Sequence, residues 1–171
     1  MQKVKSIIRL LESQDIPQIA EDLEKIGWNK PASQYESYLM EQVAKLRDVY
    51  VAFVEEQFAG YLTICWTSSY PAFRKAKIPE VVDFNVLPKF QRKGIGTQLI
   101  DLAENAIAKR SPMAGIGVGM YPNYGAAQRM YVLRGYVSDG RGLYQNDHFP
   151  KHGEQITVDD DLALYFTKEL K

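Results

Sequence analysis

The chain has 171 residues, balances 21 basic against 21 acidic side chains, and is 46% hydrophobic. This length predicts a single domain over residues 1–171 that buries its own core without a disulfide or a metal. Zero net charge argues against nucleic acid as a partner, and no apolar stretch reaches the ~20 residues that span a membrane. The single cysteine and the lack of a signal-peptide pattern predict a cytoplasmic protein.

Apolar spacing predicts a short strand and then two helices. Residues 4–11 are β-branched and apolar, as in a strand, and apolar residues then recur at helical spacing over 16–26. Gly27 stands where a helix C-terminal cap is expected. A second helix is predicted over 32–47, with one apolar stripe formed by Tyr35, Leu39, Val43 and Leu46.

The spacing then changes to that of strands. Residues 49–55 and 58–66 predict a hairpin joined by Glu56 and Gln57, and 67–79 is expected to be a loop. A further strand over 80–87 places Val82, Phe84 and Val86 on one face and Val81, Asp83 and Asn85 on the other.

The second half of the chain mixes helices and strands. The expected elements are a helix from Ile95 to near Arg110, a strand over 113–120, a helix over 123–134, extended chain from Tyr136, a polar loop over 145–155 and a strand over 162–167. The whole pattern predicts an α/β, or layered α+β, domain around a mostly antiparallel sheet.

A basic turn with two glycines, Gln91-Arg-Lys-Gly-Ile-Gly-Thr97, lies between a predicted strand and a predicted helix. A helix N-terminus there offers N–H groups to an anion, and Gly94 and Gly96 allow its close approach. The turn therefore predicts a pyrophosphate site, with an ordinary strand-to-helix turn as the alternative. Walker and Rossmann spacings both fail here, which disfavours a nucleotide-binding protein.

Three further glycines, at 115, 117 and 119, alternate along the strand predicted over 113–120. They leave one face of that strand without side chains, which indicates close approach by a helix or, less favoured, by a ligand.

The stretch Val86-Leu-Pro-Lys-Phe-Gln-Arg-Lys-Gly-Ile-Gly96 resembles the V-x-P-x-x-[RQ]-x-x-G-x-[GA] acetyl-CoA motif of the GCN5-related N-acetyltransferase (GNAT) family. One helix and one strand later, Asn123–Tyr136 resembles the family's N-x-x-A-x-x-[LM]-Y-x-x-x-G-[FY] segment. The resemblance implies a GNAT-like central mixed, mostly antiparallel sheet flanked by helices. It also implies that the sheet splays between its fourth strand, over 80–87, and its fifth, over 113–120.

The resemblance implies acetyl-CoA as cosubstrate, and the residues predict no metal. The pyrophosphate would lie on backbone N–H groups of the turn, that is, of Gln91, Arg92, Lys93, Gly94, Ile95, Gly96 and Thr97. The pantetheine amides would pair with the backbone near Phe84 and Val86, like an added strand. Asn123 would contact the pantetheine arm, and Tyr131 would face the sulfur.

Acetyl transfer requires that an ammonium with a pKa of about 10.4 lose a proton. Asp83 and Glu80 are the candidate proton acceptors, and ordered water is a third. For Asp83 a structural hydrogen-bonding role is an equal alternative. For Glu80 the alternative is a solvated position at the end of the strand. Tyr131 is predicted to protonate the departing thiolate as a general acid, against the alternative of a packed core tyrosine. The Val86 N–H is the expected donor to the oxyanion.

These residues predict an acetyl-CoA-dependent N-acetyltransferase acting on a primary amine, small-molecule or peptidyl, by direct attack through a tetrahedral intermediate. The alternative is a catalytically inactive CoA-binding regulatory module of the same fold. Tyr131 and Asn123 are both present, which favours the enzyme. The sequence is also compatible with a homodimer.

Other features favour ordinary explanations. His148 and His152 flank Pro150, which disfavours a helical metal pair. The acidic run 159–161 either attracts a cationic amine or is a solvated strand entry. Three aromatic residues either wall an acceptor pocket or pack in the core: Trp66, Tyr70 and Phe73.

Overall fold

The computed structural model describes residues 4–170, which fall into two compact units. The first unit comprises the chain up to Trp66 together with Val81–Ala106, and the second comprises Thr67–Glu80 and the chain from Ile107 onward.

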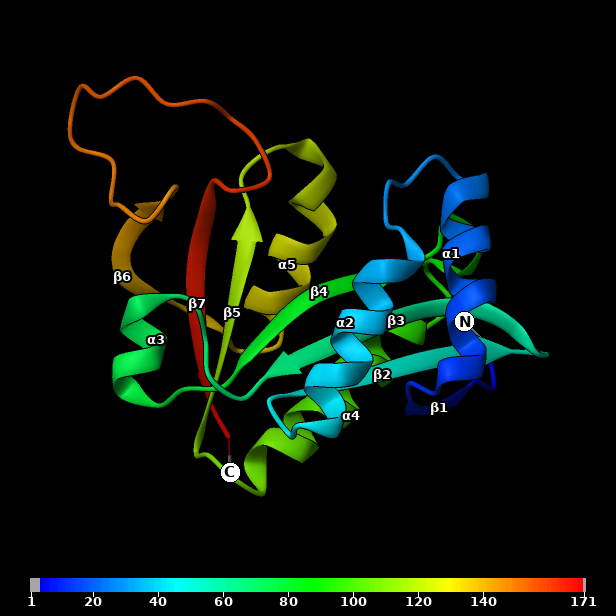
Figure 1. The fold of residues 1–171 in the computed structure, drawn as a ribbon. Coiled ribbons are helices and arrows are strands. Elements are labelled where there is room, and N and C mark those ends of the chain that lie inside the picture. The colour runs from blue at the N-terminus through cyan, green and yellow to red at the C-terminus, as the bar shows by residue number, and fades with distance from the viewer. Residues whose placement is uncertain (1–3, 171) are drawn as a thin grey trace. The chain divides into compact units, whose positions relative to one another are not determined.

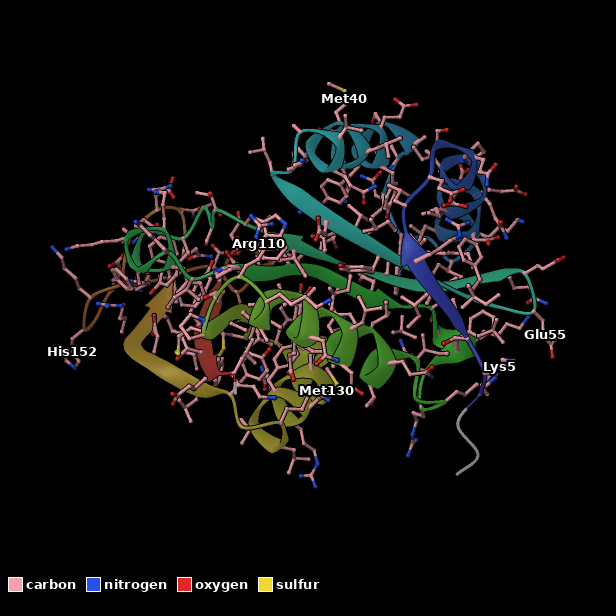
Figure 2. All side chains as sticks on the ribbon, turned by 90° about the horizontal axis from the view of Figure 1, so that it is seen from below. Lys5, Met40, Glu55, Arg110, Met130 and His152 are labelled. Atoms are coloured by element: carbon pink, nitrogen blue, oxygen red, sulfur yellow. The ribbon has the colours of Figure 1, made fainter. Side chains whose placement is uncertain are left out.

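The strands of the first unit are neighbours in the order β1 (Ile7–Leu10), β2 (Arg47–Val54), β3 (Gln57–Cys65) and β4 (Glu80–Val86). β1, β2 and β3 pair antiparallel. The β2–β3 turn is formed by Glu55 and Glu56, one residue earlier than predicted, and Figure 2 labels Glu55 at its tip. Both have positive φ, 48° and 66°, because this turn geometry matches the twist of the paired strands.

Two helices precede β2 in the first unit. α1 spans Ile16–Lys25, and Gly27, with φ of 76°, follows it as predicted. The Trp28 N–H donates to the Leu23 carbonyl across this cap at 3.0 Å, the bond of a glycine-terminated helix. α2 spans Ala32–Val43.

The prediction that the second helix continues to residue 47 is wrong. The chain leaves the helix after Val43, and Lys45 takes a left-handed conformation with φ of 60°. The Leu46 N–H then caps the Glu41 carbonyl at 2.9 Å. Val43 and Leu46 are consequently 77% and 60% exposed instead of extending the buried stripe.

α4 (Ile95–Ala108) follows β4. Figures 1 and 2 show α1 and α2 on one face of the strands of this unit and α4 on the other. Apolar side chains of both helical layers and of the strands are fully buried, among them Ile19, Leu23, Tyr35, Leu62, Ile64, Leu99 and Ala103. The two faces of β4 therefore meet different surroundings.

The second unit contains a helix where a loop was predicted. α3 spans Pro71–Ala76 within the stretch 67–79. Pro71 occupies its first turn, where a missing N–H costs nothing. Tyr70 and Phe73 are each 1% exposed, and the Tyr70 ring stacks on Tyr165 at 3.7 Å between centroids. These two aromatic residues are core, which supports the packing alternative.

The strands of the second unit run in the order β5 (Met113–Gly119), β7 (Ala163–Glu169) and β6 (Val137–Tyr144), with antiparallel pairing. The predicted helix over 123–134 is a 3₁₀ turn, Pro122–Tyr124, continuing into α5, Gly125–Leu133. Gly135 ends it with φ of 89°.

Aromatic rings cover the glycine face of β5. A Cβ on Gly115 would lie 2.3 Å from the Phe73 ring of α3, and one on Gly119 would lie 2.4 Å from the Tyr124 ring. Gly117 faces Tyr165 in the same way, at 2.9 Å. The preference for packing over a ligand at this face therefore holds, although rings rather than a helix backbone fill the space.

The fold class predicted from the sequence is confirmed as mixed α/β, with mostly antiparallel strands flanked by helices. Within residues 4–170, the helices are too short or too polar for a membrane crossing.

Candidate active site

The basic turn leads into the first turn of α4. The Gly94 carbonyl accepts the Gln98 N–H at 3.0 Å, so Gly94 is the N-terminal cap, and its φ of 84° is one that glycine adopts without strain. The N–H groups of Ile95, Gly96 and Thr97 lie within the first helical turn, where an α-helix provides no acceptor of its own. These N–H groups and the partial positive charge of the helix N-terminus suit a phosphate.

The side chains of the turn differ in what they do. Arg92 and Lys93 are exposed, and the Lys93 ammonium lies 5.6 Å from the centre of the Phe90 ring. The Gln91 side chain donates to the Val86 carbonyl at 2.9 Å, and its backbone N–H donates to the Pro88 carbonyl at 3.3 Å. Gln91 therefore ties the turn to the end of β4.

Gly96 faces β4. A Cβ at this position would lie 3.5 Å from Phe84 Cζ and 3.6 Å from Val86 Cγ2, which is ordinary van der Waals contact. The first turn of α4 thus packs on the face of β4 that carries Phe84 and Val86, as their predicted alternation requires.

β4 is irregular in the middle. Asp83 has a φ of 54°, a conformation that most side chains avoid and that Asp tolerates better than most. Beside it, β3 carries Gly60, where a Cβ would lie 2.5 Å from the Asn85 carbonyl oxygen. Only glycine at this position lets the β4 backbone come so close.

Asp83 accepts hydrogen bonds from five side chains of the first unit and is itself 13% exposed. Lys30 and Asn85 donate to Oδ1 at 2.6 and 2.7 Å. Gln34, Tyr38 and Tyr61 donate to Oδ2 at 2.9, 3.0 and 2.6 Å. Both carboxylate oxygens are occupied, so an incoming amine has to displace one of these donors before it can contact Asp83.

The tyrosines of this cluster stay protonated. Burial raises the pKa of Tyr61 and of Tyr38 far above the usual range, and the negative charge of Asp83 raises both further. They therefore remain hydrogen-bond donors to Asp83 throughout the neutral and mildly alkaline range.

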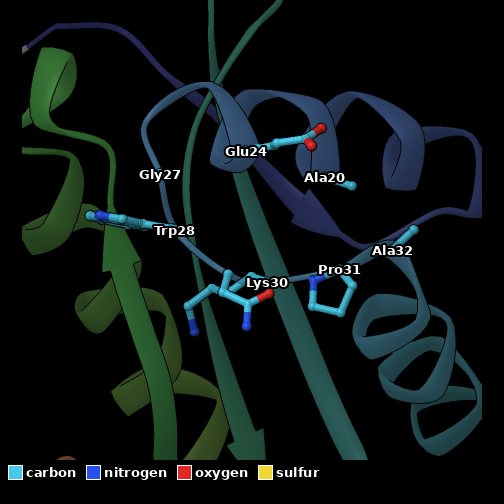
Figure 3. A pocket seen from close by; sticks show the side chains of 8 residues that line it. Ala20, Glu24, Gly27, Trp28, Lys30, Pro31 and Ala32 are labelled. Atoms are coloured by element: carbon cyan, nitrogen blue, oxygen red, sulfur yellow. The ribbon is translucent and has the colours of Figure 1, made fainter.

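The cluster adjoins a surface pocket of about 430 Å³. Figure 3 shows that its walls come from the end of α1, the following loop and the start of α2, with Trp28, Lys30 and Pro31 in the loop. Lys30 lines this pocket, and its ammonium contacts Asp83.

Of the two interpretations of Glu80, the alternative of a solvated strand end is wrong. Glu80 is 6% exposed and accepts a hydrogen bond from the Ser68 hydroxyl, which in turn accepts the Tyr70 N–H at 2.9 Å. This arrangement fastens the segment before α3 to the start of β4.

Tyr131 lies in α5 and is 4% exposed, with its ring centre 5.9 Å from that of Tyr136. Burial raises the pKa of its phenol well above the usual value, so it is protonated at neutral pH. Asn123 is exposed in the 3₁₀ turn that precedes α5. Glu80, Asn123 and Tyr131 thus belong to the second unit, whereas Asp83 and the turn belong to the first.

Three further candidates have structural partners: His148, Asp159 and Asp160. The exposed His148 pairs with Glu154 at 2.8 Å. In the acidic run, Asp159 accepts the Gln145 side chain at 2.7 Å, and Asp160 accepts Tyr124 at 3.0 Å. No group of three or more His, Cys, Asp or Glu side chains within 4–170 is arranged to hold a metal ion.

Comparison with known proteins places this architecture. The sequence pattern described as "Acetyltransferase (GNAT) family" matches residues 14–136, a stretch that includes parts of both units. The chain belongs to the GNAT acetyltransferase family. This confirms the family predicted from the two motifs.

A curated relative of this GNAT chain supports the family match. It is 34% identical over 98 residues to an uncharacterized N-acetyltransferase of Archaeoglobus fulgidus, a match that covers 55% of this chain and 65% of that relative. The chain thus spans slightly under two thirds of the curated relative's length.

Solved structures share the fold. Ard1 of Thermoplasma volcanium superposes with a TM-score of 0.70 at 16% identity, covering 98% of this chain and 99% of that one. A ribosomal-protein-alanine N-acetyltransferase of Brucella melitensis gives 0.67 at 20% identity, covering 96% and 99%.

Sequence reasoning missed the partners of Asp83 in this GNAT chain. Lys30, Gln34 and Tyr38 lie 53, 49 and 45 residues before it, and none belongs to a motif. Gly60 did carry a signal, because a glycine inside a strand indicates close approach of another backbone.

Proposed function

We propose that this chain is an acetyl-CoA-dependent N-acetyltransferase acting on a primary amine, small-molecule or peptidyl. The observation that carries the proposal is the first turn of α4, capped by Gly94 in a left-handed conformation and flanked by the exposed Arg92 and Lys93. Its N–H groups and charges fit a pyrophosphate. The GNAT match over 14–136 supports acetyl-CoA as its source and supports one acetyltransferase domain over 1–171.

In this proposal, β4 binds the pantetheine arm through the backbone of Phe84 and Val86. The Val86 N–H donates to the oxyanion that develops as the amine attacks the thioester. Asp83 attracts the acceptor ammonium. The ammonium then loses a proton to the Asp83 carboxylate or to water. Tyr131, protonated because it is buried, supplies a proton to the departing thiolate.

The acceptor enters, in this proposal, through the pocket at Trp28 and Lys30, because Lys30 lines the pocket and its ammonium contacts Asp83. The protein of Brucella melitensis is named for acetylating an alanine of a ribosomal protein, which supports including peptidyl amines among the acceptors. A single cysteine supports the cytoplasmic location that belongs to this proposal.

Calorimetry with acetyl-CoA, together with release of free CoA across a panel of amines, tests the function. We expect saturable acetyl-CoA binding that ATP does not reproduce, and CoA release that depends on the amine. Binding without CoA release for any amine would favour the inactive CoA-binding module instead.

Gly94→Val tests the pyrophosphate site. A β-branched residue with φ of 84° is strained and distorts the helix start, so we expect acetyl-CoA affinity to fall at least about tenfold. Gly153→Val is the matched control, since Gly153 has φ of 81° and no atom within 4 Å of an added Cβ. Unchanged affinity in a folded Gly94→Val protein would show that the phosphate binds elsewhere.

A further inference from the structure

The chain carries a primary amine of its own at the candidate base. Lys30 Nζ lies 2.6 Å from Asp83 Oδ1, and 5.8 Å from the centre of the Tyr61 ring. The Lys30 side chain is 23% exposed and lines the surface pocket, so solvent reaches it. The Lys30 ammonium thus already occupies the position beside Asp83 that is proposed for the ammonium of the acceptor.

The first unit orders the parts of the proposed cosubstrate site along one strand. The pyrophosphate turn follows β4, the backbone of Val86 and Phe84 comes next, and Asp83 lies one residue further from the turn. An extended pantetheine arm that runs from the turn past Val86 and Phe84 carries its thioester toward Asp83. This step rests on the proposed function.

We infer that Lys30 is an acetyl acceptor of this same chain. The Lys30 ammonium loses one proton to Asp83 or to water, and the neutral nitrogen attacks the acetyl carbonyl carbon. A nitrogen–carbon bond forms and the nitrogen gives up its second proton. The carbon–sulfur bond breaks, and CoA leaves as a thiolate that takes up this proton. The products are N-acetyl-lysine at position 30, free CoA and one proton released to solvent.

Acetylation changes the site that performs it. The product amide is neutral, so Asp83 loses the cation that contacts Oδ1 and keeps its uncharged donors, Gln34, Tyr38, Tyr61 and Asn85. The carboxylate is then without a cation and attracts an external ammonium more strongly. Lys30 is thus both an internal competitor of the acceptor and a site of covalent regulation.

Lys25 is a matched internal control. Its ammonium also contacts a carboxylate, Glu21 Oε1, at 2.7 Å, but it lies on the surface of α1 with a side chain that is 62% exposed. Spontaneous acetylation by acetyl-CoA depends on exposure and therefore favours Lys25 over Lys30. Enzymatic self-acetylation favours Lys30.

The experiment incubates the full chain with acetyl-CoA and no added amine, and peptide mass mapping follows acetylation of each lysine with time. We expect Lys30 to react roughly 10²-fold faster than Lys25, as positioned acid–base chemistry allows. The first-order rate constant, that is, the fraction of Lys30 labelled per unit time, should not depend on protein concentration, because the amine belongs to the same chain. Lys30→Arg should abolish the fast reaction, and Lys25→Arg should leave it unchanged.

Three outcomes would overturn the inference. They are equal labelling of Lys25 and Lys30, a first-order rate constant for Lys30 labelling that rises in proportion to protein concentration, or unaltered Lys30 labelling in Gly94→Val. Calorimetry and the amine panel on the same preparation separate the two proposals. Acetyl-CoA binding and amine acetylation without fast labelling of Lys30 refute self-acetylation alone. Absence of acetyl-CoA binding refutes the proposed function and, with it, this inference.

Discussion

Tyr131 is a buried phenol whose hydroxyl is proposed to act chemically. Tyr131→Phe removes only the hydroxyl, so we expect the melting temperature and acetyl-CoA affinity to change little while kcat falls about 10²–10⁴-fold. Because the interaction forms in the transition state, kcat and kcat/KM should fall together. Steady-state kinetics and a melting curve measure both.

Tyr136 provides the control for that substitution. It is another buried tyrosine, 1% exposed, and the family pattern accepts Phe or Tyr at its position. Tyr136→Phe should therefore retain kcat. Normal turnover in Tyr131→Phe, with chemistry limiting the rate, would leave Tyr131 as a core residue only.

The buried carboxylate of Asp15 stabilises the start of α1. Arg9 donates to both oxygens of Asp15 at 2.7 Å, and the Glu12 N–H donates at 2.9 Å. Burial of Asp15 opposes its ionisation, but these donors outweigh it and hold its pKa below the usual value. The stability that this lowered pKa contributes is present above the unfolded pKa of about 3.9 and is lost as pH falls through the folded value.

Asp15→Asn should therefore cost about 2 kcal/mol of unfolding free energy at neutral pH, the order expected for hydrogen bonds to a charged group. The difference from the wild type should shrink when pH falls below about 3.9. Urea unfolding across pH 2–7 measures it, with the exposed Asp161→Asn as control. A difference that stays constant with pH would contradict the assigned pairing.

At the scale of elements, the close approach of β3 and β4 shapes the candidate site. A Cβ at position 60 would meet two backbone atoms, the Asn85 oxygen at 2.5 Å and Val86 Cα at 2.9 Å. Backbone atoms move less readily than the end of a side chain. The strand that carries Asp83 and Val86 therefore depends on a glycine of its neighbour.

Gly60→Ala should lower the unfolding free energy by about 1–3 kcal/mol, as overpacking does, and should weaken acetyl-CoA binding because β4 is displaced. Gly125→Ala is the control, since an added Cβ at the start of α5 meets nothing within 4 Å. Calorimetry and denaturant unfolding of both variants provide the test. Wild-type affinity in Gly60→Ala would show that β4 tolerates the shift.

At the scale of the whole molecule, the chain keeps the GNAT fold at low sequence identity. Thermoplasma volcanium Ard1 shares 16% of its residues with this chain, and their folds still superpose over 98% of it. Such divergence is possible because a fold requires the pattern of apolar positions and turn residues rather than particular side chains. The family pattern matches residues 14–136, so it includes α1 and α2 as well as the two motifs.

The sequence by itself determined the features that depend on local chemistry. Alternation along 80–87 separated Asp83 and Asn85 from Phe84 and Val86, and glycine spacing located the start of α4. The same local rules failed where the backbone turned without glycine, at Lys45 and Glu55, because non-glycine residues with positive φ leave no mark in composition.

Only the tertiary structure decided the surroundings of Asp83. The donors Lys30, Gln34 and Tyr38 come from 45 to 53 residues away, and folding brings them to one carboxylate. It likewise decided that Glu80 is buried and that Tyr70 is core. A contact between distant residues depends on how elements pack, whereas periodicity and turn chemistry act within a few residues of the chain.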